Sequence, residues 1–193
     1  MQWLDTREKY GIVSRVLHWG MAGLLLWQFT GMVLRGIFGR VPPVSFFVGS
    51  HGAIGALLFT LIVVRLLWGL TNRSRRPFYE PGVLGLLAKA GHLALYVLML
   101  VVPLLALLRA YGSGRGFQPF GIPLFPATGE QTAWLMAPAN AAHGLLAWVL
   151  LLLIAGHVGM VLVHQFIWRD DVAGRMLPAA GRRAAGGTAS PAR

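Results

Sequence analysis

Hydrophobic residues run with few interruptions through four segments of this chain, and polar residues gather between the segments. The apolar runs cover approximately residues 16–34, 46–70, 83–108 and 141–167. A helix needs about 20 apolar residues to cross a hydrocarbon core that is about 30 Å thick, so each run is long enough. The first run contains polar and aromatic residues and lacks a small-residue cleavage site after it, so we expect it to remain in the mature protein. The pattern predicts four transmembrane helices.

The composition is typical of a membrane protein, because 56% of the 193 residues are hydrophobic and only 12% are charged. The chain has no cysteine, which excludes a disulfide framework, a thiolate iron–sulfur site and covalently attached c-type haem. Its formal net charge of +11 is best explained by orientation in the membrane and by anionic lipid headgroups. We therefore expect contacts with membrane lipid and no nucleic-acid partner.

Positive charges are concentrated on one side of the expected bundle. Thirteen of the 17 Lys and Arg residues fall in the N-terminal arm, the connection after the second run, the C-terminal end and the adjoining helix ends. The other four are Arg35, Arg40, Arg109 and Arg115, around the two remaining connections. By the positive-inside rule, both termini are cytoplasmic. The sequence thus predicts an all-α integral membrane protein, a multi-pass four-helix up-down-up-down bundle.

The segments outside the helices carry less information. We assign residues 1–178 to the membrane domain and expect residues 179–193, which are basic and low in complexity, to form a flexible tail that can contact anionic lipid. The Gly- and Pro-rich outer connection, 109–140, contains several large apolar residues and is expected to fold as a cap on the bundle. Tryptophans near the helix ends are typical of the aromatic belts at membrane interfaces.

Histidines are the chemically informative residues. All six lie in the expected helices or at their ends, where a polar group is costly unless it is functional or paired. They are His18, His51, His92, His143, His157 and His164. His143 and His157 are 14 residues apart on one helix, so they share a face to within about 40° and lie roughly 21 Å apart in depth. Each of the two levels therefore needs a partner from another helix.

Counting depth from the outer helix ends pairs the histidines across the bundle. His51 matches His143 near the outer side, and His18 matches His157 about 25 Å from the outer boundary. His92 lies at the same depth as the inner pair, so by depth alone it could replace either inner residue. Two imidazole pairs at two heights are what two b-type haems need, since each iron takes one nitrogen from each face of the porphyrin. A structural zinc site is the competing interpretation, but its four ligands must lie close together.

Four stretches of the chain carry a family resemblance. They are "SRVLHWG" (14–20), "GSHGAIGALLFTLIVVRLLWGL" (49–70), "LAKAGHLALYVLMLVVPLLALL" (87–108) and "AGHVGMVLVHQFIWRDDVAGRMLP" (155–178). Together they resemble the prokaryotic cytochrome b561 family, and within it most closely the four-helix superoxide oxidase type. The resemblance covers nearly the whole chain except the tail and part of the outer connection.

This resemblance implies an oxidoreductase of the bacterial inner membrane that contains two haem b groups. It assigns His18 and His157 to the inner iron and His51 and His143 to the outer iron, in agreement with the pairing by depth. It also places His92 and His164 near ubiquinone on the cytoplasmic side, whereas a hydrogen-bonded interfacial histidine is the plain alternative for both. In this interpretation superoxide gives up its electron on the outer side, and ubiquinone is reduced near the cytoplasmic side.

The outer arginines have two possible roles. Arg35 and Arg115, with Arg40 and Arg109, can attract anionic superoxide or can pair with haem propionates. Arg65, 14 residues inward from His51, can serve an inner propionate or a lipid phosphate. We therefore list Arg35 and Arg115 with His92 and His164 as candidate catalytic residues.

Two other functions remain open at this point. The chain can be an electron-transfer subunit that links a protein electron donor, such as a dehydrogenase, a hydrogenase or a soluble cytochrome, to the quinone pool. It can also be a haem-storing or structural membrane protein without turnover. An exposed apolar outer surface is expected for the subunit, and failure of quinone to reoxidise the reduced haems is expected for the storage protein.

Overall fold

The computed structural model describes residues 2–79, 81–170 and 172–177. Its four long helices are α1 (Ile12–Phe38), α2 (Pro42–Thr71), α3 (Val83–Gly112) and α4 (Ala133–Leu162), and a π-helical segment, Val163–Trp168, continues α4. All four are long and apolar enough to cross a membrane. The first three contain the first three expected runs, and α4 together with the π-helical segment contains the fourth. The prediction of an all-α four-helix transmembrane bundle is confirmed.

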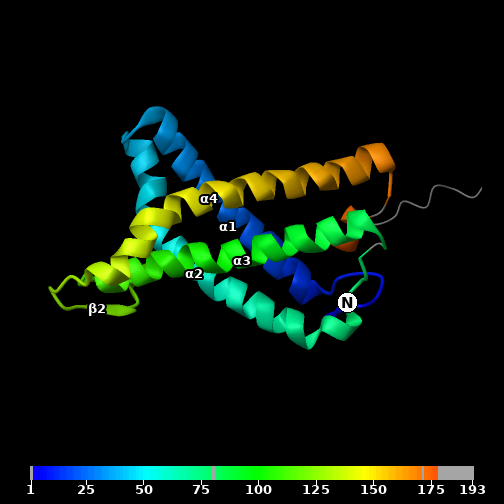
Figure 1. Cartoon of the computed structure of the whole chain (residues 1–193), viewed down its shortest axis with the longest axis horizontal. Helices are drawn as coiled ribbons and strands as arrows, with labels where there is room; N and C mark the ends of the chain where they lie inside the picture. The colour runs from blue at the N-terminus through cyan, green and yellow to red at the C-terminus, as the bar shows by residue number, and fades with distance from the viewer. Residues whose placement is uncertain (1, 80, 171, 178–193) are drawn as a thin grey trace, which may run out of the picture.

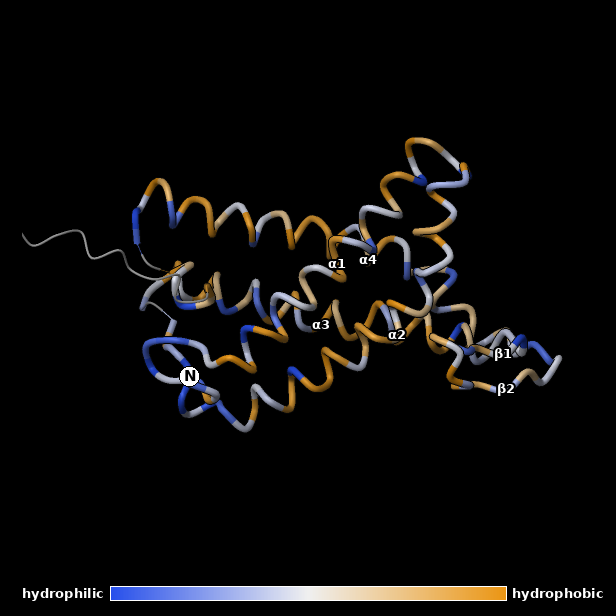
Figure 2. Tube along the Cα trace, turned by 180° about the vertical axis from the view of Figure 1, so that it is seen from behind, coloured by the Kyte–Doolittle hydropathy of each residue, from blue (hydrophilic) through white to orange (hydrophobic). Residues whose placement is uncertain are grey.

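The helices are arranged as two antiparallel hairpins. Residues 39–41 join α1 to α2, which pack along each other, and α3 and α4 form the second pair. The two hairpins cross, with α2 against α3, and their tips diverge at the end that carries connections 39–41 and 113–132 (Figures 1 and 2). The space between the hairpins is where side chains from all four helices can face one another.

Both ends of the described chain meet at the opposite end of the bundle. The Trp19 indole donates a hydrogen bond to the Met176 carbonyl at 3.0 Å, which joins the start of α1 to the segment after α4. Asp5 forms an ion pair with Arg76 (Nε–Oδ2 3.1 Å), which joins the N-terminal segment to the connection after α2. This end is more hydrophilic than the helices that lead to it (Figure 2). We call it the terminal end and the other the hairpin end.

The long connection at the hairpin end is folded. Strands β1 (Arg115–Phe117) and β2 (Phe125–Ala127) pair antiparallel, with Arg115 opposite Ala127. Phe117 packs on α2, since a Cβ added at Gly52 would lie 3.3 Å from its ring. This agrees with the expected cap, although Phe120 and Ile122 at its tip remain exposed.

The helices bury little against one another. Among the described residues only eight hydrophobic side chains are buried, and the central cluster contains Met21, Leu58 and Ile62. The remaining apolar surface of the helices faces outward or toward a cavity in the bundle. The expected tail, 179–193, lies outside the described residues.

Candidate functional site

The two histidines near the hairpin end face each other across the bundle. His51 comes from α2 and His143 from α4, and their ring centres are 6.2 Å apart at an interplanar angle of 81°. His143 Nδ1 lies 3.0 Å from the carbonyl oxygen of Val102 in α3. Because a carbonyl only accepts, Nδ1 carries the hydrogen, and Nε2 of His143 is free to bind a metal.

Three histidines meet at the deeper level. The ring centres of His18 in α1 and His157 in α4 are 6.3 Å apart. His92 in α3 is also near, with its ring centre 5.2 Å from that of His157. Its Nδ1 donates to the Ala88 carbonyl at 2.7 Å. The structure therefore brings together the three residues that the depth argument left as alternatives.

A cavity of about 680 Å³ is lined by the rings of His51 and His143. Residues of all four helices line it, and most of its lining is apolar, including Met32, Leu107 and Ala147. This volume is within the range of about 300–1,000 Å³ that is usual for ligand and cofactor sites. His51 and His143 are thus set in the walls of a space large enough for a cofactor.

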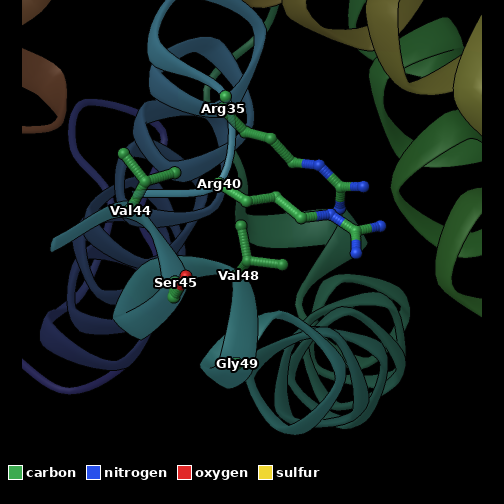
Figure 3. A pocket seen from close by; sticks show the side chains of 7 residues that line it. Arg35, Arg40, Val44, Ser45, Val48 and Gly49 are labelled. Atoms are coloured by element: carbon green, nitrogen blue, oxygen red, sulfur yellow. The ribbon is translucent and has the colours of Figure 1, made fainter. Parts of the chain in front are cut away.

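The cationic side chains of this cavity lie toward the hairpin end. Arg35 and Arg109 both line it, and Arg109 Nε donates to the Asn140 side-chain oxygen at 2.8 Å. Arg35 also lines a second cavity of about 280 Å³, together with Arg40. The side chains of Arg35 and Arg40 extend in the same direction (Figure 3). Arg115, in contrast, is exposed on β1 and lines neither cavity.

Arg65 points into the bundle at the level of the deeper histidines. Its Nε donates to the Tyr96 hydroxyl at 3.0 Å, and its Nη2 lies 3.1 Å from His18 Nδ1. An arginine only donates, so His18 Nδ1 accepts in this arrangement. Binding of a metal through His18 Nε2 puts the ring hydrogen on Nδ1, and Arg65 then has to turn toward another acceptor.

His164 lies in the π-helical segment at the terminal end, close to two other groups. Its Nδ1 is 2.7 Å from Asp170 Oδ2, and its ring centre is 4.6 Å from that of Trp168. The chain reverses after the helix, with Arg169 in the left-handed region at φ 56°, and the Asp170 amide then donates to the His164 carbonyl. The hydrogen bond from His164 lowers the pKa of the Asp170 carboxyl below its ordinary value of 3.8. Asp170 is therefore ionised at neutral pH and accepts the hydrogen on Nδ1, which leaves Nε2 of His164 free.

A family model described as prokaryotic cytochrome b561 matches residues 9–179, which include all four helices. The chain belongs to this family. As a prokaryotic cytochrome b561 it is a bacterial membrane protein that binds haem b and transfers electrons, and the family predicted from the sequence is confirmed.

Three curated relatives match the chain over most of their length. "Cytochrome b561 homolog 2" of Escherichia coli K12 is 34% identical over 186 residues, which cover 92% of this chain and 95% of that protein. "Probable superoxide oxidase CybB" of Yersinia pestis is 27% identical over 174 residues, covering 89% and 97%. "Cytochrome b561 homolog 1" of E. coli K12 is 26% identical over 166 residues, covering 84% and 93%.

The ring separations suit a metal held between two histidines, and the described residues do not form the larger cluster that a structural zinc site needs. A metal bonded to one nitrogen of each ring, at about 2 Å a bond, holds the ring centres roughly 6 Å apart, because each centre lies about 1 Å behind its nitrogen. The measured separations are 6.2 and 6.3 Å, whereas His92 and His157 are 1.1 Å closer than the deeper pair (6.3 − 5.2). Within residues 2–79, 81–170 and 172–177, no three His, Asp or Glu side chains form a metal cluster, as a tetrahedral zinc site would need.

Two residues beside these histidines were not singled out from the sequence. Gln28 is buried in α1, lines the large cavity, and donates from Nε2 to the His51 carbonyl at 3.0 Å. Asp170 holds His164. Gln28 stands out in the sequence as a polar residue inside the apolar run "LLLWQFTGM" (24–32), because polar side chains at membrane depth are costly. The contact between Asp170 and His164 depends on a chain reversal that no local sequence pattern predicts.

Proposed function

We propose that this protein binds two haem b groups and uses them to pass electrons from superoxide on the hairpin side to ubiquinone on the terminal side. The outer haem is held by His51 and His143 and the inner haem by His18 and His157. The observation that carries the proposal is the pair of ring separations, 6.2 and 6.3 Å, at two depths of one bundle. Bound haem b supplies reversible one-electron transfer between the two sides.

The residues at the hairpin end suit a small anionic substrate. Arg35, Arg40 and Arg109 line the two cavities there. Connection 113–132 contains one acidic residue, Glu130. A local excess of positive charge raises the encounter rate of an anion such as superoxide. Arg35 and Arg109, which border the large cavity, also suit the propionates of the outer haem. Arg115, being outside both cavities, contributes only to the long-range potential.

The residues at the terminal end suit a quinone and its protons. His92 and His164 have their Nδ1 hydrogens committed to the Ala88 carbonyl and to Asp170, so Nε2 of each ring is the nitrogen available to a quinone oxygen. Asp170 is exposed and holds the His164 ring through Nδ1, so Nε2 is the nitrogen that can pass a proton to a bound quinone. We assign His92 to binding the quinone and His164 to delivering protons.

The orientation follows from the charges. The terminal end carries most of the Lys and Arg residues, so we assign it to the cytoplasm and the protein to the bacterial inner membrane. Residues 1–178 form the membrane domain in this proposal, and the basic residues of 179–193 can contact anionic lipid. The protons for ubiquinone then come from the cytoplasm.

The proposed reaction balances in electrons and protons. Two superoxide anions each lose one electron and leave as dioxygen, and one ubiquinone gains two electrons and two protons to become ubiquinol. A superoxide pulse applied to the purified protein with ubiquinone is expected to give one quinol for every two superoxide ions, and superoxide dismutase is the control that abolishes it. Absence of haem reduction by superoxide in a protein that dithionite reduces would overturn the choice of superoxide.

A protein electron donor is the second candidate, and one observation favours it. Phe120, Ile122 and Leu124 of the outer connection and Trp134 at the start of α4 are all exposed, from 47% to 73%. Such an apolar group at one end of the bundle is expected where a partner protein docks. Slow haem reduction by superoxide that becomes fast when a reduced cytochrome or dehydrogenase is added would support this function.

A further inference from the structure

One wall of the large cavity contains two buried polar atoms without partners. His51 Nδ1 and Gln28 Oε1 are both buried, and neither makes a hydrogen bond. Both residues line the cavity, and Gln28 is only 9% exposed. Burying a polar group without a hydrogen-bond partner costs free energy, so two such atoms in contacting residues need an explanation.

The usual acceptor for a helical histidine is not available to His51. His92 shows the common arrangement, in which Nδ1 bonds the carbonyl four residues earlier. For His51 that carbonyl belongs to Phe47, and it accepts the Ser50 hydroxyl at 2.9 Å in addition to the helical amide. Ser50 is itself held by the Trp27 indole at 2.9 Å. The Phe47 carbonyl therefore has no free lone pair for the His51 ring.

Gln28 is already attached to His51 through the backbone. Its Nε2 donates to the His51 carbonyl at 3.0 Å, which fixes the identity of the amide atoms, because an oxygen in that place would face another acceptor. The remaining amide oxygen is the acceptor that lacks a hydrogen. When His51 binds iron through Nε2, its Nδ1 carries a hydrogen and needs such an acceptor.

We propose that Gln28 is a positioning residue for His51, whose Nδ1 hydrogen its amide oxygen accepts after a small adjustment of the side chain. This inference rests on the proposed function, in which His51 binds the outer haem. Metal-bound histidines nearly always donate their second ring hydrogen, and such a bond fixes the ring and raises its basicity. His143, the other proposed ligand of the outer haem, has the Val102 carbonyl as the acceptor for its Nδ1 hydrogen. A more basic His51 favours ferric over ferrous iron and lowers the reduction potential of the outer haem.

The test is a redox titration of the purified holoprotein in four forms: wild type, Q28M, Q28E and T60V. Q28M keeps the length of the side chain but removes the acceptor, and Q28E keeps an acceptor. T60V removes a hydroxyl from the exposed face of α2, where Thr60 donates to the Ala56 carbonyl. We expect Q28M to raise the midpoint potential of one haem and to speed its loss to apomyoglobin by about tenfold. Q28E is expected to titrate at or below the wild-type potential, and T60V to match wild type.

Other results overturn the inference. A Q28M protein with wild-type potentials, or with both haems shifted equally, shows that Gln28 does not act through His51. If Q28M loses the outer haem altogether, the Q28E protein decides the question. The inference requires Q28E to retain that haem and to titrate it at or below the wild-type potential. The ligand assignment itself is tested separately: an H51A protein that keeps both haems refutes the proposed function, whatever Q28M does.

Discussion

In several of the histidine rings the surrounding structure commits one nitrogen and leaves the other free. In His92, His143 and His164 the committed nitrogen is Nδ1, which faces an oxygen that accepts its hydrogen. In His51, Nδ1 makes no hydrogen bond within the described residues. The sequence supplied the positions and depths of these rings, because helical geometry is regular. It could not supply their partners, which come from other helices or from a chain reversal.

The proposed role of His164 is separate from haem binding, and this can be tested directly. An H164A protein is expected to retain both haem spectra but to reoxidise with added ubiquinone about a hundredfold more slowly, since a proton donor is removed. Stopped-flow absorbance of the reduced protein measures the rate. Q165A, a change at an exposed neighbour in the same segment, is the matched control. Loss of a haem from H164A would show that the inner ligand pair is wrong.

Arg40 separates anion attraction from haem binding, because it lines the smaller cavity and not the larger one. We expect R40Q to lower the rate of haem reduction by superoxide about threefold at low ionic strength, and the difference to shrink as salt screens the charge. Pulse radiolysis at two salt concentrations measures this. R73Q, a change at the terminal end, should have no effect on the rate. A salt-independent loss in R40Q would mean that the charge does not act by attraction.

At the scale of elements, the apolar runs predicted the helices but not their ends. Helix α4 begins at Ala133, eight residues before the expected start at 141, because Pro138 and Asn140 interrupt the apolar pattern. A proline is tolerated inside a membrane helix, where neighbouring groups satisfy the freed carbonyl. The hairpin of β1 and β2 was expected only as a folded cap, since three-residue strands leave no alternation to detect. Its turns depend on glycines with positive φ, such as Gly114 at 65° before β1 and Gly121 at 80° between the strands.

The N-terminal segment is fixed to the bundle by one buried carboxylate. The side chain of Asp5 is fully buried, with Oδ2 on Arg76 and Oδ1 accepting the Gly11 amide at 2.9 Å. D5A leaves Arg76 without its counter-ion and is expected to lower the free energy of unfolding by about 3–5 kcal/mol. D5N should cost less, because it keeps an acceptor for Gly11. Denaturation in detergent micelles measures both, against E8A at an exposed acid as control; equal stability of D5A and E8A contradicts this view.

At the scale of the whole molecule, the crossing of the two helix hairpins creates the cavity that the cofactor needs. Periodicity could not predict it, because the angle between hairpins depends on packing over the whole interface. The sequence predicted which residues face each other at each depth. It did not predict that Arg35 and Arg109 border the cavity while Arg115 stays outside it.

The orientation in the membrane is open to a simple test, because the chain has no cysteine. Single-cysteine variants at exposed positions of the two ends, S74C and Q131C, can be treated in intact spheroplasts with a membrane-impermeant maleimide. Q131C is expected to react at once, and S74C only after lysis. The reverse pattern would place the terminal end outside the cell and would remove the cytoplasmic source of protons.

The number of haems bound by each chain tests the central claim most directly. Purified protein, assayed for haem b by pyridine haemochrome and for protein by amino-acid analysis, is expected to contain two haems per chain. H51A and H157A should each contain one, because each removes a ligand from a different pair. One haem in the wild-type chain, or two in either variant, would contradict the assignment of two histidine pairs to two irons.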